Sequence, residues 1–137
     1  MLAALQDKLA VGSKELFKAG TTLIGGVAGR GETCGALTGA LLAVGSLVGR
    51  ERLEDRDQVR NAMVPATQVY LRFQEEVGHT ICQEIHKLLY GRVYRLYIPE
   101  EREALHSLGG ERGLGCAKVC GIAARIAADV ILDIKNA

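Results

Sequence analysis

No stretch of this 137-residue chain concentrates lysine and arginine. Its 17 basic side chains nearly balance 16 acidic ones, which leaves a formal net charge of +1. Proteins that bind nucleic acid need a dense basic surface that neutralises a run of phosphates. The even balance of charge therefore argues against a nucleic-acid partner.

The sequence also lacks an apolar run long enough to cross a membrane. Its uncharged segment at residues 33–49 is bounded by charged residues and falls short of the about 20 apolar residues that a membrane span needs. The first twenty residues are amphipathic and interrupted by charges, unlike a secretion signal. We therefore expect a cytoplasmic protein with no membrane span.

Strict alternation of apolar and polar residues, typical of a half-buried strand, is absent as well. Apolar residues instead recur at intervals of three and four, and no repeat or linker divides the chain. The pattern predicts one all-α domain over residues 1–137, a compact bundle of about four main helices plus a short helix. A chain of this length buries enough apolar surface without disulfides, so its cysteines need another explanation.

Glycine and proline delimit the predicted helices. Within the second helix Gly35 and Gly39 lie one turn apart, and glycine costs a helix about 1 kcal/mol unless something compensates. Close approach of another backbone is the expected compensation, which places this helix at the centre of the molecule. GGVAGRG and GGERGLG are expected to be turns, because neither follows a predicted strand or matches a full phosphate-loop motif. The predicted helices run from Leu2 to Gly20, from Glu32 or Thr33 to Gly49, from Pro65 (which opens or kinks its helix) to Leu89, from Pro99 to Gly110, and from 114 to 135.

Four cysteines, Cys34, Cys82, Cys116 and Cys120, carry the most reactive side chains. Cys116 and Cys120 lie four apart on one helical face, with β-carbons about 5–6 Å apart, whereas a disulfide needs about 3.5–4.5 Å. Two thiolates at about 2.3 Å from one metal ion suit this spacing better. We expect Cys34 in the first turn of its helix, where free amides and the helix dipole lower a thiol pKa.

Other interpretations of the same residues stay open. Reduced cysteine often fills a core as a small hydrophobe, so core packing competes with a shared site. Cys82 is expected within the third helix, where His79 and His86 share its flank. Both histidines are candidates to extend the site, but a solvated helix surface is the expected place for them, as for His106. The absence of a CxxCH motif excludes covalently attached c-type haem, and no carboxylates form a convincing general acid–base pair.

The cysteine-containing segments resemble a known family. GRGETCGALTGALLAVG, with Cys34 at the start of CGALTG, resembles the CGAxxG motif that begins a helix in the C_GCAxxG_C_C family of redox-active proteins. GHTICQEIHKLLYGRVY is similar to the family's next cysteine block, at Cys82, and CAKVCGIAARIAADVIL to its C-terminal block, at Cys116. Together they span roughly the last five sixths of the chain, and their order is more specific than any one motif. Many members also carry a cysteine in a preceding helix, which this chain replaces with Cys120.

The resemblance implies redox chemistry. The blocks at Cys82 and Cys116 are also similar to the cluster-carrying part of split-Soret cytochromes, without the haem part, which implies an iron–sulfur site and a dimer. The leading hypothesis is a small redox protein, expected as a homodimer, in which Cys34, Cys82, Cys116 and Cys120 bind an iron–sulfur cluster of the two-iron (2Fe-2S) type for electron transfer with an unidentified partner protein. The alternatives are a metal-free thiol–disulfide protein, a structural zinc site and a helical interaction module.

Overall fold

The computed structural model describes residues 1–109 and 115–137 of the chain. Within these two ranges the regular elements are helices and no β-strand is present, so the predicted all-α class is confirmed. The elements, in chain order, are α1 (Leu2–Leu9), α2 (Lys14–Gly20), the 3-10 turn η1 (Thr21–Leu23), α3 (Gly35–Val48), α4 (Arg56–Val77), α5 (Cys82–Tyr90), α6 (Pro99–Gly109) and α7 (Cys116–Asn136).

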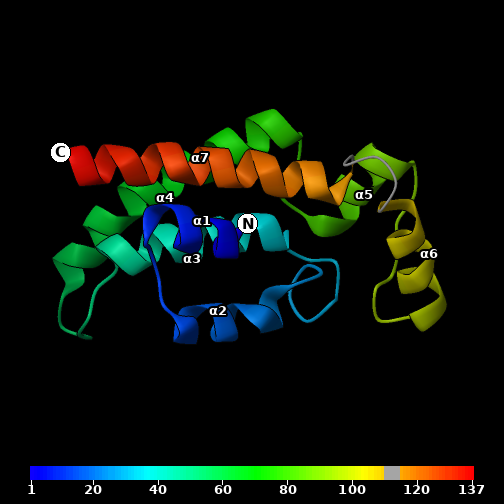
Figure 1. The fold of residues 1–137 in the computed structure, drawn as a ribbon, viewed down its shortest axis with the longest axis horizontal. Coiled ribbons are helices and arrows are strands. Elements are labelled where there is room, and N and C mark those ends of the chain that lie inside the picture. The colour runs from blue at the N-terminus through cyan, green and yellow to red at the C-terminus, as the bar shows by residue number, and fades with distance from the viewer. Residues whose placement is uncertain (110–114) are drawn as a thin grey trace.

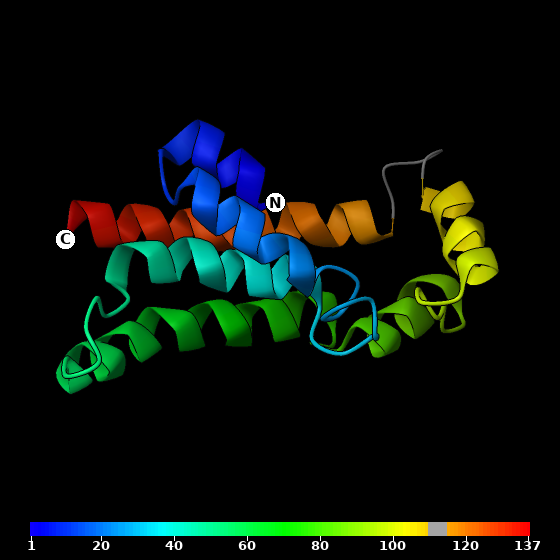
Figure 2. The same cartoon turned by 90° about the horizontal axis from the view of Figure 1, so that it is seen from below.

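Three long helices form the body of the molecule. α3 packs against both α4 and α7, which also contact each other, and Figure 2 shows the three lying side by side. α1 packs on α3 and α7, and α2 contacts α3. α5 and α6 lie at the end of this body that is away from the C-terminus (Figure 1). This end carries the cysteines.

The segment that forms α3 is uncharged because it lies in the middle of the molecule. Leu37 and Ala40 have no exposed surface, and burial of a side chain such as Leu37 contributes about 1.5–3 kcal/mol. The backbone approaches Gly35 closely enough that an added β-carbon would lie 3.4 Å from the Cα of Ile24. The predicted central position of this helix is therefore confirmed. The other helices contribute Leu5, Val69, Phe73, Ile85, Val119, Ala123, Ile126 and Ile131 to the same core.

The first predicted helix is two helices in the structure. Ala10 and Gly12 adopt left-handed backbone conformations, with φ of 52° and 77°, which end α1. Ser13 then caps α2 by accepting a hydrogen bond from the backbone N–H of Leu16. The predicted continuous helix to Gly20 was wrong because apolar spacing continues across this break while the backbone does not.

The third predicted helix is also divided. α4 begins at Arg56, so Pro65 lies inside it and does not open it. Gly78, with φ of 99°, ends α4, and α5 begins at Cys82. The prediction of one helix to Leu89 was wrong, and Cys82 starts a helix instead of lying within one.

Two expectations fall outside the described residues. They are the start of the last helix at residue 114 and the end of the short helix at Gly110, together with most of the GGERGLG segment. Among the helices of residues 1–109 and 115–137, none is long and apolar enough to cross a membrane.

Candidate functional site

Backbone pairing places Cys34 beside Cys82. The N–H of Cys34 donates to the carbonyl of Thr80 (2.9 Å), and the N–H of Cys82 donates to the carbonyl of Glu32 (2.6 Å). Cys34 is the N-cap residue of α3 and Cys82 is the first residue of α5. Glu32 and Thr33, which were expected to begin or cap the helix, instead form the connection that pairs with the start of α5.

The glycine-rich segment before Cys34 supports this pairing. Five consecutive residues, Gly25 to Gly29, have left-handed φ values between 52° and 73°. A β-carbon on Gly26 would lie 2.7 Å from the Cβ of Cys82 and 2.6 Å from the amide nitrogen of Glu32, so the close approach requires glycine. The amides of residues 27–32 donate to carbonyls of the chain itself. The segment is therefore a turn, as predicted, and the amides from Val27 onward are not free to cradle a phosphate.

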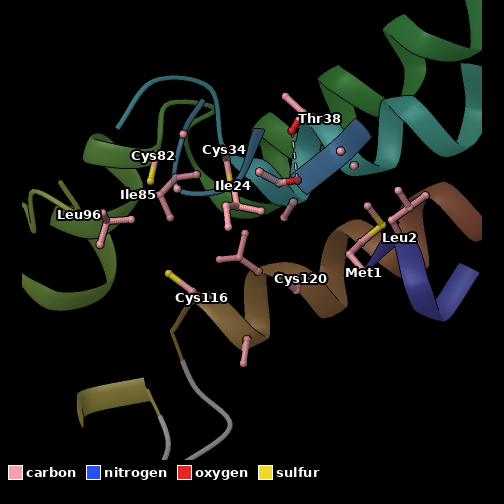
Figure 3. Close-up of a pocket in the computed structure, with 18 of the residues that line it drawn as sticks. Met1, Leu2, Ile24, Cys34, Thr38, Cys82, Ile85, Leu96, Cys116 and Cys120 are labelled. Atoms are coloured by element: carbon pink, nitrogen blue, oxygen red, sulfur yellow. Dashed lines mark hydrogen bonds between the residues drawn. The ribbon is translucent and has the colours of Figure 1, made fainter. Parts of the chain in front are cut away.

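The other two cysteines lie in the first turns of α7. Cys116 is exposed and begins the helix, and Cys120 is half-buried one turn later. The backbone N–H of Cys116 donates to the hydroxyl of Tyr90 at 3.0 Å, which ties the start of α7 to the end of α5. Figure 3 shows Cys116 and Cys120 on α7 across the cavity from Cys34 and Cys82.

All four cysteines line one cavity of about 880 Å³. The cavity runs from the cysteines to the side chains of Met1 and Leu2 near the start of the chain (Figure 3). Its lining is mostly apolar, and the N-terminal ends of α3, α5 and α7 all open onto it. The structure thus brings together the four predicted site residues. Apolar side chains in the lining include Ile24, Leu42, Ile85, Leu96, Leu105 and Val119.

Burial controls the thiol pKa of Cys34. Burial raises this pKa above its usual value, while the amides of Ala36 and Leu37 at the start of α3 act in the opposite direction with a smaller effect. Charge on Cys120 and Cys116 raises it further. The predicted lowering at the helix N-terminus was wrong in direction, because removal from water outweighs the helix amides.

Cys82 and Cys120 show the same behaviour. Burial, followed by charge on Cys34 and Cys116, raises the pKa of Cys82 to about 12. Burial also raises the pKa of Cys120, although the ammonium group of Met1 acts against it. In the neutral pH range the three thiols carry their protons unless a cation is bound beside them.

His86 is part of the cavity wall. Its side chain is only 1% exposed, its Nε2 lies 3.7 Å from the Sγ of Cys82, and its Nδ1 accepts from the backbone N–H of Tyr94 at 3.4 Å. Burial lowers the pKa of His86. The expectation of a solvated surface was wrong for this residue, and its position one helical turn after Cys82 was the sequence signal that pointed to the site.

The remaining histidines have other surroundings. His79 is half-buried, and its Nδ1 accepts from the backbone N–H groups of Thr80 and Ile81 at 3.0 Å each, which orders the turn between α4 and α5. His106 is exposed, as predicted, at the edge of the cavity. In the part of the chain that the structure describes, no three His, Cys, Asp or Glu side chains converge closely enough to hold one metal ion.

The fold and the site define a class of small helical protein whose cysteines gather at one apolar cavity. Comparison with protein families shows which one: the family model described as "Putative redox-active protein (C_GCAxxG_C_C)" matches residues 1–130. The chain belongs to this redox-active family, which confirms the resemblance drawn from the cysteine motifs. No curated protein and no solved structure matches the chain.

Proposed function

We propose that this protein binds an iron–sulfur cluster of the two-iron type through Cys34, Cys82, Cys116 and Cys120 and uses it for one-electron transfer. The observation that carries the proposal is the gathering of four free cysteines, from the starts of three helices, around one apolar cavity. Four cysteine thiolates are the usual ligand set of such clusters.

The spacing of the sulfurs favours a cluster over a single ion. A single zinc ion holds its thiolates at about 2.3 Å, which forces the sulfurs close together. Within the described residues no three candidate ligands are that close, yet all four cysteines line one cavity. A cluster divides its four ligands between several metal atoms, so its ligands stand farther apart. The spacing of the four cysteines therefore fits a cluster better than the structural zinc site considered above.

The surroundings also suit a bound group of negative charge. The N-terminal ends of α3, α5 and α7 face the cavity, and each carries the positive end of a helix dipole. The lining is mostly apolar, and access of water is one of the factors that set a cluster potential. When bound, the cluster would accept one electron from a one-electron donor protein and return it to a one-electron acceptor, with no bond made or broken in the polypeptide.

The raised thiol pKa values weaken the metal-free thiol–disulfide alternative. Disulfide exchange needs a thiolate nucleophile, and burial keeps Cys34, Cys82 and Cys120 protonated near neutral pH. A metal changes this balance because it replaces the proton on each sulfur. Buried thiols around one cavity are therefore better suited to bind metal than to attack a disulfide.

Anaerobic purification tests the proposal directly. The protein is isolated without oxygen, or reconstituted with ferrous iron and sulfide, and then analysed for iron and acid-labile sulfide and by visible absorption. We expect two irons and two sulfides per chain and charge-transfer absorption that bleaches on reduction. Colourless protein that binds no iron after reconstitution would refute the proposal, and reversible loss of two hydrogens by mass spectrometry without metal would support the disulfide alternative.

Single replacements assign the ligands. Cys34→Ser, Cys82→Ser, Cys116→Ser and Cys120→Ser should each lower iron content and alter the visible spectrum. Met63→Ser serves as the matched control, because Met63 is 53% exposed on α4 and outside the cavity lining, so loss of its sulfur should leave the iron content unchanged. Any cysteine whose replacement behaves like Met63→Ser is not a ligand.

A further inference from the structure

One face of α5 carries three side chains with polar or reactive groups. Cys82, His86 and Tyr90 are spaced by four residues, so they follow one another along the same helical face. All three line the cavity. Only Cys82 is used by the proposed ligand set, which leaves a buried imidazole and a hydroxyl beside the sulfurs.

The hydrogen bonds of His86 identify which nitrogen carries its proton. The Nδ1 atom accepts from the N–H of Tyr94, so the neutral ring has its hydrogen on Nε2. That nitrogen lies 3.7 Å from the Sγ of Cys82, within the range of an N–H to sulfur hydrogen bond. With 1% of the side chain exposed, water does not compete for this donor.

Tyr90 is held beside Cys116 through the backbone of that residue. Its oxygen accepts from the backbone N–H of Cys116 at 3.0 Å, which leaves its own hydrogen available to the neighbouring thiol. Interaction with the Cys116 side chain contributes to the raised pKa of Tyr90, after the larger effect of burial. A side chain at position 115 would collide with the Tyr90 hydroxyl, so Gly115, with φ of 76°, permits this approach.

Ring contacts keep the two donors in place. The rings of His86 and Tyr90 meet edge to face with centroids 6.0 Å apart, and Tyr94 contacts both, at 6.1 Å and 5.8 Å. The backbone of Tyr94 also supplies the hydrogen bond to Nδ1. Packing therefore fixes the positions of both rings before any group enters the cavity.

We infer that α5 supplies hydrogen-bond donors to two of the four sulfurs, His86 Nε2–H to Cys82 and Tyr90 O–H to Cys116, and that these positioning residues raise the reduction potential of the site. The inference rests on the proposed function, since it concerns the potential of the cysteine-bound cluster. Added electrons place negative charge on the sulfurs, and a donor aimed at sulfur stabilises that charge. The hydrogen bonds therefore stabilise the reduced form of the site more than the oxidised form, which raises the reduction potential.

The test compares reduction potentials of the reconstituted protein. Tyr90→Phe removes only the hydroxyl, and His86→Phe removes the donor but keeps an aromatic ring. Each should weaken electron affinity by about tenfold, or about 59 mV for a one-electron couple. His86→Gln retains an N–H donor and should recover part of this loss. Tyr97→Phe is the matched control, because Tyr97 is 46% exposed, lies outside the cavity lining, and should keep the wild-type potential.

A second readout separates hydrogen bonding from general damage. Iron–sulfur stretching frequencies, measured by resonance Raman spectroscopy, should shift in Tyr90→Phe and His86→Phe and remain unchanged in Tyr97→Phe. If His86→Phe does not fold, Tyr90→Phe decides alone. Clusters that form with unchanged potentials in Tyr90→Phe overturn this inference and leave the proposed function standing, whereas wild-type protein that forms no cluster overturns both.

Discussion

The raised pKa of Cys82 predicts a specific loss of stability at alkaline pH. The residue Cys82 is 8% exposed, and the pKa of its thiol rises from 9.0 to about 12, mainly through burial. The folded protein therefore keeps this proton between pH 9 and 12, while the unfolded chain releases it. Ionisation then favours the unfolded state. The contribution of Cys82 to the unfolding free energy is therefore fully present below pH 9 and is lost as pH rises toward 12.

The magnitude follows from the same shift. Each pH unit between 9 and 12 lowers the unfolding free energy by about 1.4 kcal/mol for each such thiol. Between pH 8 and pH 10, Cys82 should remove about 1.4 kcal/mol of unfolding free energy. Lysine and tyrosine also titrate toward pH 10, and comparison with a variant that lacks only this thiol subtracts their effect. Burial raises the pKa of Cys34 and Cys120 as well, so these thiols add losses of the same sign.

Urea unfolding of the reduced, metal-free protein at pH 8, 9 and 10 measures the effect. Cys82→Ala should lose about 1.4 kcal/mol less stability over this range than wild type, because it has no thiol to ionise at this position. Gln83→Ala is the control: it loses a hydrogen bond to the Arg30 carbonyl but no titrating group, so its pH dependence should equal that of wild type. Equal pH dependence in Cys82→Ala and wild type would refute the reasoning.

Two further predictions concern the backbone and the core. Gly26→Ala should lower the unfolding free energy by about 3 kcal/mol in urea unfolding, because the added β-carbon collides with Cys82 and the residue has a left-handed φ. Gly91→Ala, with φ of 74° and open space around it, should cost about 1 kcal/mol. Equal costs would contradict the close approach at Gly26. Phe73→Ala should lower the unfolding free energy by about 3–5 kcal/mol because the ring is fully buried, whereas Leu71→Ala on the exposed side of α4 should change it by no more than about 0.5 kcal/mol. Similar melting temperatures for the two variants would argue against the described core.

Helical class and the identity of the reactive residues were readable from the sequence. Apolar spacing of three and four predicts helices from side chains alone, because it reports which face of a helix avoids water. The uncharged segment around Leu37 and its spaced glycines indicated a central helix, and the structure confirms this position. The same spacing passes through Gly12 and Gly78 without interruption, so it did not reveal that the backbone turns left-handed there and ends a helix.

The sequence by itself therefore determined an all-α protein with four cysteines in the motifs of a redox-active family. Tertiary structure alone decided that these cysteines share one cavity, because pairing of Cys34 with Thr80 and contact of Cys116 with Tyr90 join segments far apart in the chain. It also decided the burial of His86 and the rise of the thiol pKa values. Both depend on how much water the surrounding helices remove, which spacing along a chain does not encode.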